Sequence, residues 1–155
     1  MANTTGGRAR VMAWQGTANR IIRTLLRTPL LCRGIGKRLL TVYVVGRKTG
    51  RRYSIPVAYT RHDGALLVGT PFAWARNLRT DDTVQIRLLG RLRPATVRVH
   101  AGEAEVVERY GVISRGNHQF ARFNGIGIDP DGSPNAADLR SAWANGARVI
   151  ELCPQ

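Results

Sequence analysis

The feature that most limits the fold of this chain is a series of short apolar segments that begins at Leu39 and is interrupted by turn-forming residues. Several segments alternate apolar with polar residues, which is typical of strands in a half-buried sheet. The predicted strands are residues 39–45, 53–60, 65–70, 83–89, 92–100 and 147–152. Arg-His-Asp-Gly at 61–64 and Gly-Arg at 90–91 predict tight connections. Six strands with few helices predict a mainly β protein with flanking helices, built as a six-stranded antiparallel barrel.

Helical segments are expected between and after these strands. The stretch 71–82 begins with Pro71 and predicts a short helix. A second helix is expected from Gly102 to about Ser114, and a looser one over residues 117–123. The stretch 125–138 is rich in Gly, Pro and Asp and is predicted to be a loop without a calcium-binding pattern. The barrel domain is therefore expected to span residues 37–155.

The N-terminal residues have a different composition. Residues 1–10 are small, polar and basic, which predicts a disordered start. From Val11 to Leu26 apolar residues recur at three- and four-residue steps, so residues 11–36 are predicted to hold a basic amphipathic helix and a connection. Two environments suit such a helix: an anionic membrane surface, or the protein's own barrel.

Location and redox state follow from what the sequence lacks. No apolar run approaches the roughly 20 residues of a membrane span, and no signal-peptide pattern is readable. A cytoplasmic protein is expected, with peripheral binding to the inner face of the cell membrane as the hypothesis that the amphipathic helix raises. The two cysteines and three histidines match no metal-ligand spacing. We therefore expect a reduced protein without a metal.

Charge narrows the class of partner. The formal net charge is +14, from 24 Lys and Arg against 10 Asp and Glu. Such a chain favours an anionic partner, which can be nucleic acid, a phospholipid surface or a phosphorylated or polycarboxylate ligand. Nucleic acid is the weakest of the three, because Tyr43, Tyr53 and Tyr59 are not grouped with further aromatic residues for base stacking.

The basic charge is concentrated in the connection Gly-Arg-Lys-Thr-Gly-Arg-Arg at 46–52. A hairpin turn needs far less charge than this. One interpretation is a solvated basic hairpin. The other is an anion cradle, in which glycines let the backbone approach the ligand while Arg47 and Lys48 supply charge. Pro56 in the following strand is expected to interrupt the ladder and expose backbone groups to that ligand.

The segment LLTVYVVGRKTGRRYSIPVAYTRHDGALLVGT, followed by WARNL and an alternating hairpin, resembles the deazaflavin (F420)-dependent nitroreductases and quinone reductases of actinobacteria. The resemblance covers roughly residues 39–99, with a weaker match at the C-terminal strand. It implies a split β-barrel of the FMN-binding type. It also implies that reduced coenzyme F420 passes a hydride to quinones, nitro compounds or activated alkenes.

The resemblance further implies a set of cofactor-binding residues. The Gly-Arg-Lys-Thr-Gly loop would hold the phosphate and the acidic tail, the next strand would lie along the deazaflavin ring, and later residues would flank that ring. These residues are Arg47, Lys48, Thr49, Gly50, Tyr53, Ser54, Ile55, Pro56, Gly69, Thr70, Trp74 and Asn77. The loop after Thr70 is shorter than in the family and lacks a phosphate-contacting lysine, which Arg76 or Arg79 would replace.

The residues expected to face the electron acceptor differ from those of the family. The helix predicted over residues 117–123 reads HQFARF, where tyrosines are usual. Phe120 and Phe123 are expected to shape the substrate pocket, and Tyr110, His118 or solvent to donate a proton. The alternative is a non-catalytic split barrel that binds a fatty acid, a lipid or another cofactor such as FMN or haem, FMN being a weaker candidate than F420. Split barrels often pair, so a homodimer is a further expectation.

Overall fold

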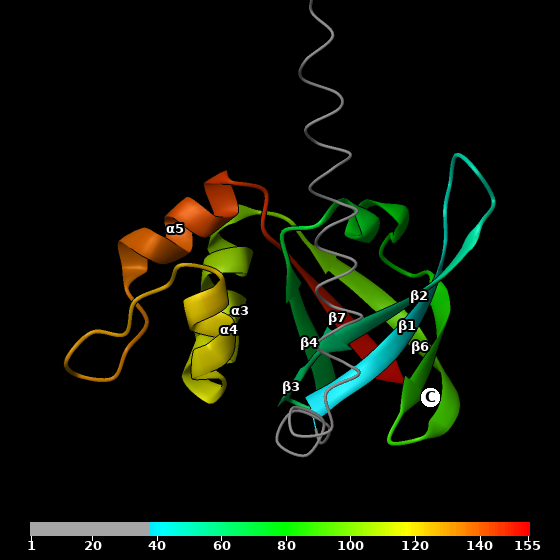
Figure 1. The fold of residues 1–155 in the computed structure, drawn as a ribbon, viewed down its shortest axis with the longest axis horizontal. Helices are drawn as coiled ribbons and strands as arrows, with labels where there is room; N and C mark the ends of the chain where they lie inside the picture. The colour runs from blue at the N-terminus through cyan, green and yellow to red at the C-terminus, as the bar shows by residue number, and fades with distance from the viewer. Residues whose placement is uncertain (1–37) are drawn as a thin grey trace, which may run out of the picture. The chain divides into compact units, whose positions relative to one another are not determined.

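The computed structural model describes residues 38–155 (Figure 1), so the predictions for residues 1–10 and for a helix within 11–36 lie outside the described residues. Along the chain the described residues form β1 (Leu39–Val45), β2 (Arg52–Ala58), β3 (Thr60–His62), β4 (Ala65–Thr70), the 3-10 helix η2 (Ala73–Asn77), β5 (Thr83–Leu88), β6 (Arg91–His100), α3 (Glu103–Gly116), α4 (His118–Phe123), α5 (Ala136–Ala144) and β7 (Arg148–Pro154). No helix in this range is long and apolar enough to cross a membrane.

The strands form one antiparallel sheet in the order β2-β1-β5-β6-β7-β4-β3. β2 and β3 follow each other in the chain, with Tyr59 between them, yet they occupy opposite edges of the sheet. The sheet must therefore curl until its edges approach each other, and Figure 1 shows this curled arrangement. The predicted fold class, a mainly β antiparallel split barrel with flanking helices, is confirmed.

The strand count is seven where the sequence predicted six. The segment predicted as a single strand over 53–60 is divided at Tyr59, which is buried and donates its backbone N–H to the carbonyl of Arg38. This division has a geometric cause, because one extended segment has to serve both edges of the curled sheet.

Pro56 does not interrupt the pairing of β2 with β1, contrary to expectation. The register runs without a break from Leu39 opposite Ala58 to Val45 opposite Arg52, with Pro56 opposite Thr41. β2 is an edge strand, where a residue without an N–H is tolerated because no second neighbour needs its donor.

Alternation along the strands separates two cores. Inward-facing side chains fill the barrel interior, and they include Leu40, Val42, Val44, Leu66, Val68, Val84, Ile86, Leu88, Val97, Ile150 and Leu152. A second core lies between the sheet and the helices and includes Leu67, Val106, Tyr110, Ile113, Leu139 and Val149. β4 contributes to both cores, which explains why its sequence is apolar at consecutive positions.

The helices gather on one side of the barrel (Figure 1). His100 at the end of β6 helps to fasten them, because its Nε2 lies 2.8 Å from Glu151 of β7 and its Nδ1 lies 3.4 Å from Glu105 of α3. α5 was not predicted, and its first residues fell in the expected loop over 125–138. Its N-terminus is capped by Asn135, whose side chain accepts the N–H of Asp138 at 3.1 Å.

Candidate functional site

The anion-binding connection predicted over residues 46–52 is observed as a loop over residues 46–51, because Arg52 is the first residue of β2. The loop connects β1 to β2 and projects from the barrel (Figure 1). Two backbone bonds of 2.8 Å close it: Gly46 N–H donates to the carbonyl of Arg51, and Gly50 N–H donates to the carbonyl of Gly46. Gly50 has a φ of +67°, a conformation that side chains with a Cβ rarely adopt. Gly50 is thus needed to turn the loop back on itself.

Arg47 fastens this loop to η2. Its backbone N–H donates to Oδ1 of Asn77 at 3.1 Å, and its Nε donates to the carbonyl of Asn77 at 3.0 Å. Its guanidinium also lies 3.6 Å from the carboxylate of Asp82. Asn77 in turn donates from Nδ2 to the carbonyl of Trp74 at 3.0 Å. We call this set of contacts the Arg47–Asn77 clasp; it brings the loop and the Trp74 helix together at one place.

The other basic side chains of the connection form no such contacts within residues 38–155. Lys48, Arg51 and Arg52 are exposed, and none of them forms an ion pair with any residue from 38 to 155. Arg76 and Arg79 are exposed in the same way. These side chains therefore leave positive charge available to an anion beside the clasp.

The strand residues of the predicted site divide between two faces of β2. Tyr53 and Ile55 lie opposite the inward-facing Val44 and Val42, so they share the interior side of the barrel. Ile55 and Trp74 pack against the barrel core, and Tyr53 is 42% exposed. Ser54 and Pro56 alternate with these residues and belong to the outer face. The structure thus brings Tyr53, Ile55 and Trp74 to one side and separates them from Ser54 and Pro56.

Thr70 and Gly69 have structural roles at the end of β4. Thr70 is buried, and its Oγ1 accepts the N–H of Phe72 at 3.1 Å in the turn that leads into η2. A Cβ on Gly69 would lie 2.5 Å from the ring of Phe120 and 3.1 Å from the ring of Tyr110. The space beside Gly69 is therefore filled by the helical layer of the protein.

The residues expected on the acceptor side do not form one pocket. Phe120 packs against Tyr110 with ring centroids 5.0 Å apart, inside the core between sheet and helices. Phe123 is 72% exposed and lines a separate cavity of about 390 Å³ with Pro71 and Asn145. Phe120 and Phe123 are three residues apart and therefore neighbours on the surface of α4. Phe120 nevertheless packs against the core, whereas Phe123 is exposed.

The proposed proton donors also differ in environment. The hydroxyl of Tyr110 is buried and has no hydrogen-bond partner among the described residues. Burial raises the pKa of Tyr110 well above its ordinary value, so this phenol holds its proton. His118 is exposed at the first residue of α4. Neither residue lines the 390 Å³ cavity beside Phe123 or the groove that Asn77 of η2 helps to line.

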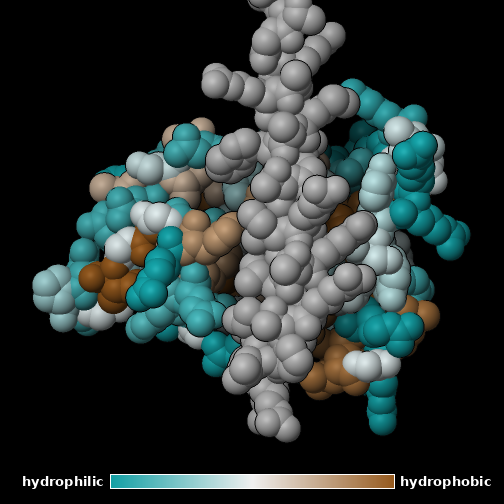
Figure 2. Space-filling model, in the orientation of Figure 1, coloured by the Kyte–Doolittle hydropathy of each residue, from teal (hydrophilic) through white to brown (hydrophobic). Residues whose placement is uncertain are grey.

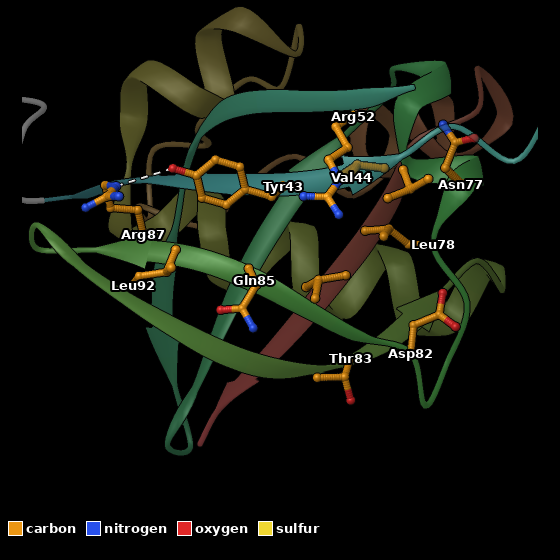
Figure 3. A pocket seen from close by; sticks show the side chains of 12 residues that line it. Tyr43, Val44, Arg52, Asn77, Leu78, Asp82, Thr83, Gln85, Arg87 and Leu92 are labelled. Atoms are coloured by element: carbon orange, nitrogen blue, oxygen red, sulfur yellow. Dashed lines mark hydrogen bonds between the residues drawn. The ribbon is translucent and has the colours of Figure 1, made fainter. Parts of the chain in front are cut away.

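A groove that the sequence did not predict is lined by outward-facing residues of β1 and β5 and also by the core residues Val44, Leu78 and Val84 (Figure 3). Its volume is about 610 Å³, and its lining includes Tyr43, Val45, Arg52, Asn77, Gln85, Arg87 and Leu92. Arg87 donates from Nε to the hydroxyl of Tyr43 at 3.3 Å across its floor. Alternation in β1 and β5 was a usable signal, because it places Tyr43, Gln85 and Arg87 on the face opposite the barrel core.

Fold and site together define a class of protein: a small split barrel with a cationic loop next to a short helix, η2, that carries Trp74. Residues 8–121 match the family model described as F420H(2)-dependent quinone reductase, and this match covers most of the chain. The chain belongs to this family. It is therefore an F420-dependent oxidoreductase, and coenzyme F420 is its cofactor.

Solved structures with similar folds have low sequence identity to this chain. An F420-H2 dependent reductase, FDR-A, is 13% identical with a TM-score of 0.47, and the alignment covers 74% of this chain and 94% of that one. A protein described as a domain-swapped dimer is 13% identical with a TM-score of 0.46, covering 91% and 98%. A protein of Bacteroides thetaiotaomicron named for 5-nitroimidazole antibiotic resistance is 12% identical with a TM-score of 0.49, covering 83% and 81%. No curated protein matches the chain.

Proposed function

We propose that this chain uses reduced F420 to reduce quinones, nitro compounds or activated alkenes, and that loop 46–51 receives the phosphate and acidic tail of the cofactor. The observation that carries the proposal is the Arg47–Asn77 clasp, since it fixes the loop beside Trp74 while Lys48 and Arg51 remain unpaired within residues 38–155. A tail of phosphate and carboxylates is complementary to these free cations.

The residues present fit such a cofactor in charge and in shape. Lys48, Arg51 and Arg52 supply the cations, and Gly50 allows the backbone to turn close to a ligand. Tyr53 and Trp74, which belong to the interior side of the barrel, supply flat apolar surfaces for a ring. Reduced F420 supplies the hydride when it is bound, and the protein contributes binding, orientation and a shielded surface.

Arg47 has a different role in this proposal. Its guanidinium is already engaged with Asn77 and Asp82, so it acts as a positioning residue that holds the loop. Protons for the reduced acceptor come from solvent, because burial raises the pKa of Tyr110 and leaves its hydroxyl without a partner in the described residues.

Parallel titrations of the purified full chain test the proposal. Reduced F420, FMN and a fatty acid are titrated separately. A quinone, a nitro compound or an activated alkene is then added to the F420 complex to follow cofactor oxidation. We expect micromolar binding of reduced F420, equivalent to about 8 kcal/mol, weaker binding of FMN, and quinone-dependent oxidation. Binding of the fatty acid or FMN without binding of F420 would refute the proposed site. Binding of F420 without oxidation by any of the three acceptor classes would refute the proposed reaction.

A further inference from the structure

The turn between β5 and β6 contains a leucine in an unfavourable conformation. Leu88 pairs with Arg91, so the turn consists of Leu89 and Gly90, not of Gly90 and Arg91 as the sequence suggested. Both have positive φ, +50° for Leu89 and +80° for Gly90. Such two-residue turns favour Asn, Asp or Gly at the first position, because a Cβ is strained there. Leu89 is also 64% exposed, so core packing does not explain its presence.

The surroundings of Leu89 combine apolar and basic side chains. Leu92 is 55% exposed and shares one face of the hairpin with Arg87, its partner across the strands; the exposed Arg91 and Arg93 lie on the other face. None of the three arginines pairs with an acidic residue within 38–155. No Asp or Glu occurs from residue 83 to residue 100. We call residues 87–93 the hairpin tip: two exposed leucines next to three arginines that have no acidic partner within residues 38–155.

The hairpin tip is also held in place. Arg87 donates from Nη1 to the carbonyl of Gly90 at 3.1 Å and from Nε to Tyr43 at 3.3 Å. The strand connection that leads into β6 extends from the lower end of the barrel (Figure 1), and Figure 2 shows apolar side chains next to hydrophilic ones over the same region. The tip thus presents its leucines on an ordered hairpin.

We propose that the hairpin tip binds the surface of an anionic phospholipid bilayer. Leu89 and Leu92 enter the boundary between headgroups and acyl chains, and the guanidinium groups of Arg91 and Arg93 contact lipid phosphates, while Arg87 holds the turn. A bilayer surface offers a negative layer directly above an apolar one, which matches both halves of the tip. Nucleic acid offers the negative charge but no apolar layer for exposed leucines, so the lipid surface is the better match. This inference does not rest on the proposed function.

Vesicle flotation of the full chain tests the proposal with matched variants. The vesicles contain phosphatidylcholine alone or an equal mixture with phosphatidylglycerol, at low and high salt. For the double variant Leu89→Asn/Leu92→Asn we expect at least a tenfold lower partition coefficient on anionic vesicles. Asn tolerates positive φ, so the turn is retained. The control Ile128→Asn, at a 38% exposed residue of the loop before α5, should change partitioning less than twofold.

The charge contribution has its own control. Arg91→Gln and Arg93→Gln should each lower partitioning on anionic vesicles by about fivefold at low salt, as expected for one basic residue near such a surface. Arg122→Gln and Arg140→Gln remove the same charge from exposed residues of the helices and should change it less than twofold. Equal effects of the tip and helix variants would overturn the proposal, because only net charge would then matter.

A labelled variant reports the position of the tip directly. In a Cys32→Ser/Cys153→Ser chain, Leu89→Cys carries an environment-sensitive dye, and Ile128→Cys carries the same dye as the control. We expect a blue-shifted emission with anionic vesicles for the dye at position 89 and none at position 128. Vesicle binding with a water-exposed dye at 89 would assign the binding to another part of the chain and overturn the proposal. Absence of vesicle binding would overturn it as well.

Discussion

Replacing Lys48 by alanine tests whether the charge of this side chain serves ligand binding or the stability of the fold. Lys48 is exposed in the connection between β1 and β2, and its side chain forms no ion pair within residues 38–155 that its removal would break. The free energy of unfolding should therefore change by less than about 0.5 kcal/mol, as for ordinary surface substitutions.

Binding of reduced F420 should respond much more strongly to this substitution. A charge-assisted hydrogen bond to a phosphate or carboxylate is worth about 1 to 3 kcal/mol when the complex partly removes it from water. Lys48→Ala should thus raise the dissociation constant by roughly 5- to 150-fold. Added salt should weaken the wild-type complex more than the variant complex, because screening acts on a contact that the variant lacks.

Arg47→Ala supplies the contrast, since the structure gives Arg47 a different role. The substitution removes the 3.0 Å bond to the carbonyl of Asn77, worth about 0.5 to 1.5 kcal/mol. It also removes the ion pair with Asp82, which is worth little because both side chains are more than a third exposed. The bond from the backbone of residue 47 to Asn77 remains. We expect the unfolding free energy to fall by about 1 kcal/mol and F420 binding to weaken through a looser loop.

Two measurements on each variant decide between these roles. Urea unfolding followed by tryptophan fluorescence gives the stability, and calorimetric titration with reduced F420 at low and high salt gives the affinity. Arg47→Lys is the control for charge: it keeps the cation but loses the guanidinium geometry, so it should not restore the stability lost in Arg47→Ala. If Lys48→Ala binds F420 as tightly as wild type at low salt, the charge of the loop is only solvated surface and the reasoning fails.

Substitutions at three further sites test the packing beside Gly69, the role of Tyr110 and the conformation of Leu89. Gly69→Ala should cost about 1 to 3 kcal/mol of unfolding free energy, and Phe120→Leu in the same chain should recover part of it in urea denaturation, since the new Cβ would lie 2.5 Å from the Phe120 ring. Tyr110→Phe should retain quinone reduction, and a large loss of turnover would instead make Tyr110 the proton donor. Burial raises the pKa of Tyr110 in the folded state, so the unfolding free energy of the wild type should fall as the pH rises above about 10, the pKa of a tyrosine in the unfolded chain. The Tyr110→Phe variant should lose less unfolding free energy over the same pH range. Leu89→Asn should raise the melting temperature by a few degrees, since about 0.5 to 1 kcal/mol of strain is relieved; an unchanged or lower value would contradict the strained turn.

The sheet was predictable because its signal is local. Short apolar segments between turn residues placed β1, β4, β5, β6 and β7 within two residues of their observed bounds, and α3 and α4 were predicted at their observed places. The break at Tyr59 was not predictable, because it depends on closure of the barrel between edges that are distant in the sheet. α5 was missed because it follows a Gly- and Pro-rich loop, although Asn135 and Asp138 form a recognisable capping signal.

The position of the turn at Leu89 was also predicted wrongly from the sequence. Glycine next to arginine suggested a turn at 90–91, since leucine is rarely chosen for a positive φ. The observed register instead places Leu89 in the turn and leaves its side chain exposed. Leucine is disfavoured in a turn with positive φ. Its presence at position 89 therefore points to a requirement other than local conformational propensity.

The sequence predicted which residues make up the candidate site, but not which of its cations are free to bind a ligand. The sequence showed a surplus of positive charge in the connection at 46–52, and that surplus alone could not distinguish a ligand-binding cation from one that the protein uses for itself. The distinction depends on Asn77 and Asp82, which lie 30 residues or more beyond Arg47 in the chain and meet it only when η2 folds over the end of the barrel. Arg47 is satisfied by these partners, whereas Lys48, one residue further on, finds none among residues 38–155. Since adjacent residues of the same charge differ in this way, the contacts of each side chain, and not the density of charge, decide which cation is available to the cofactor.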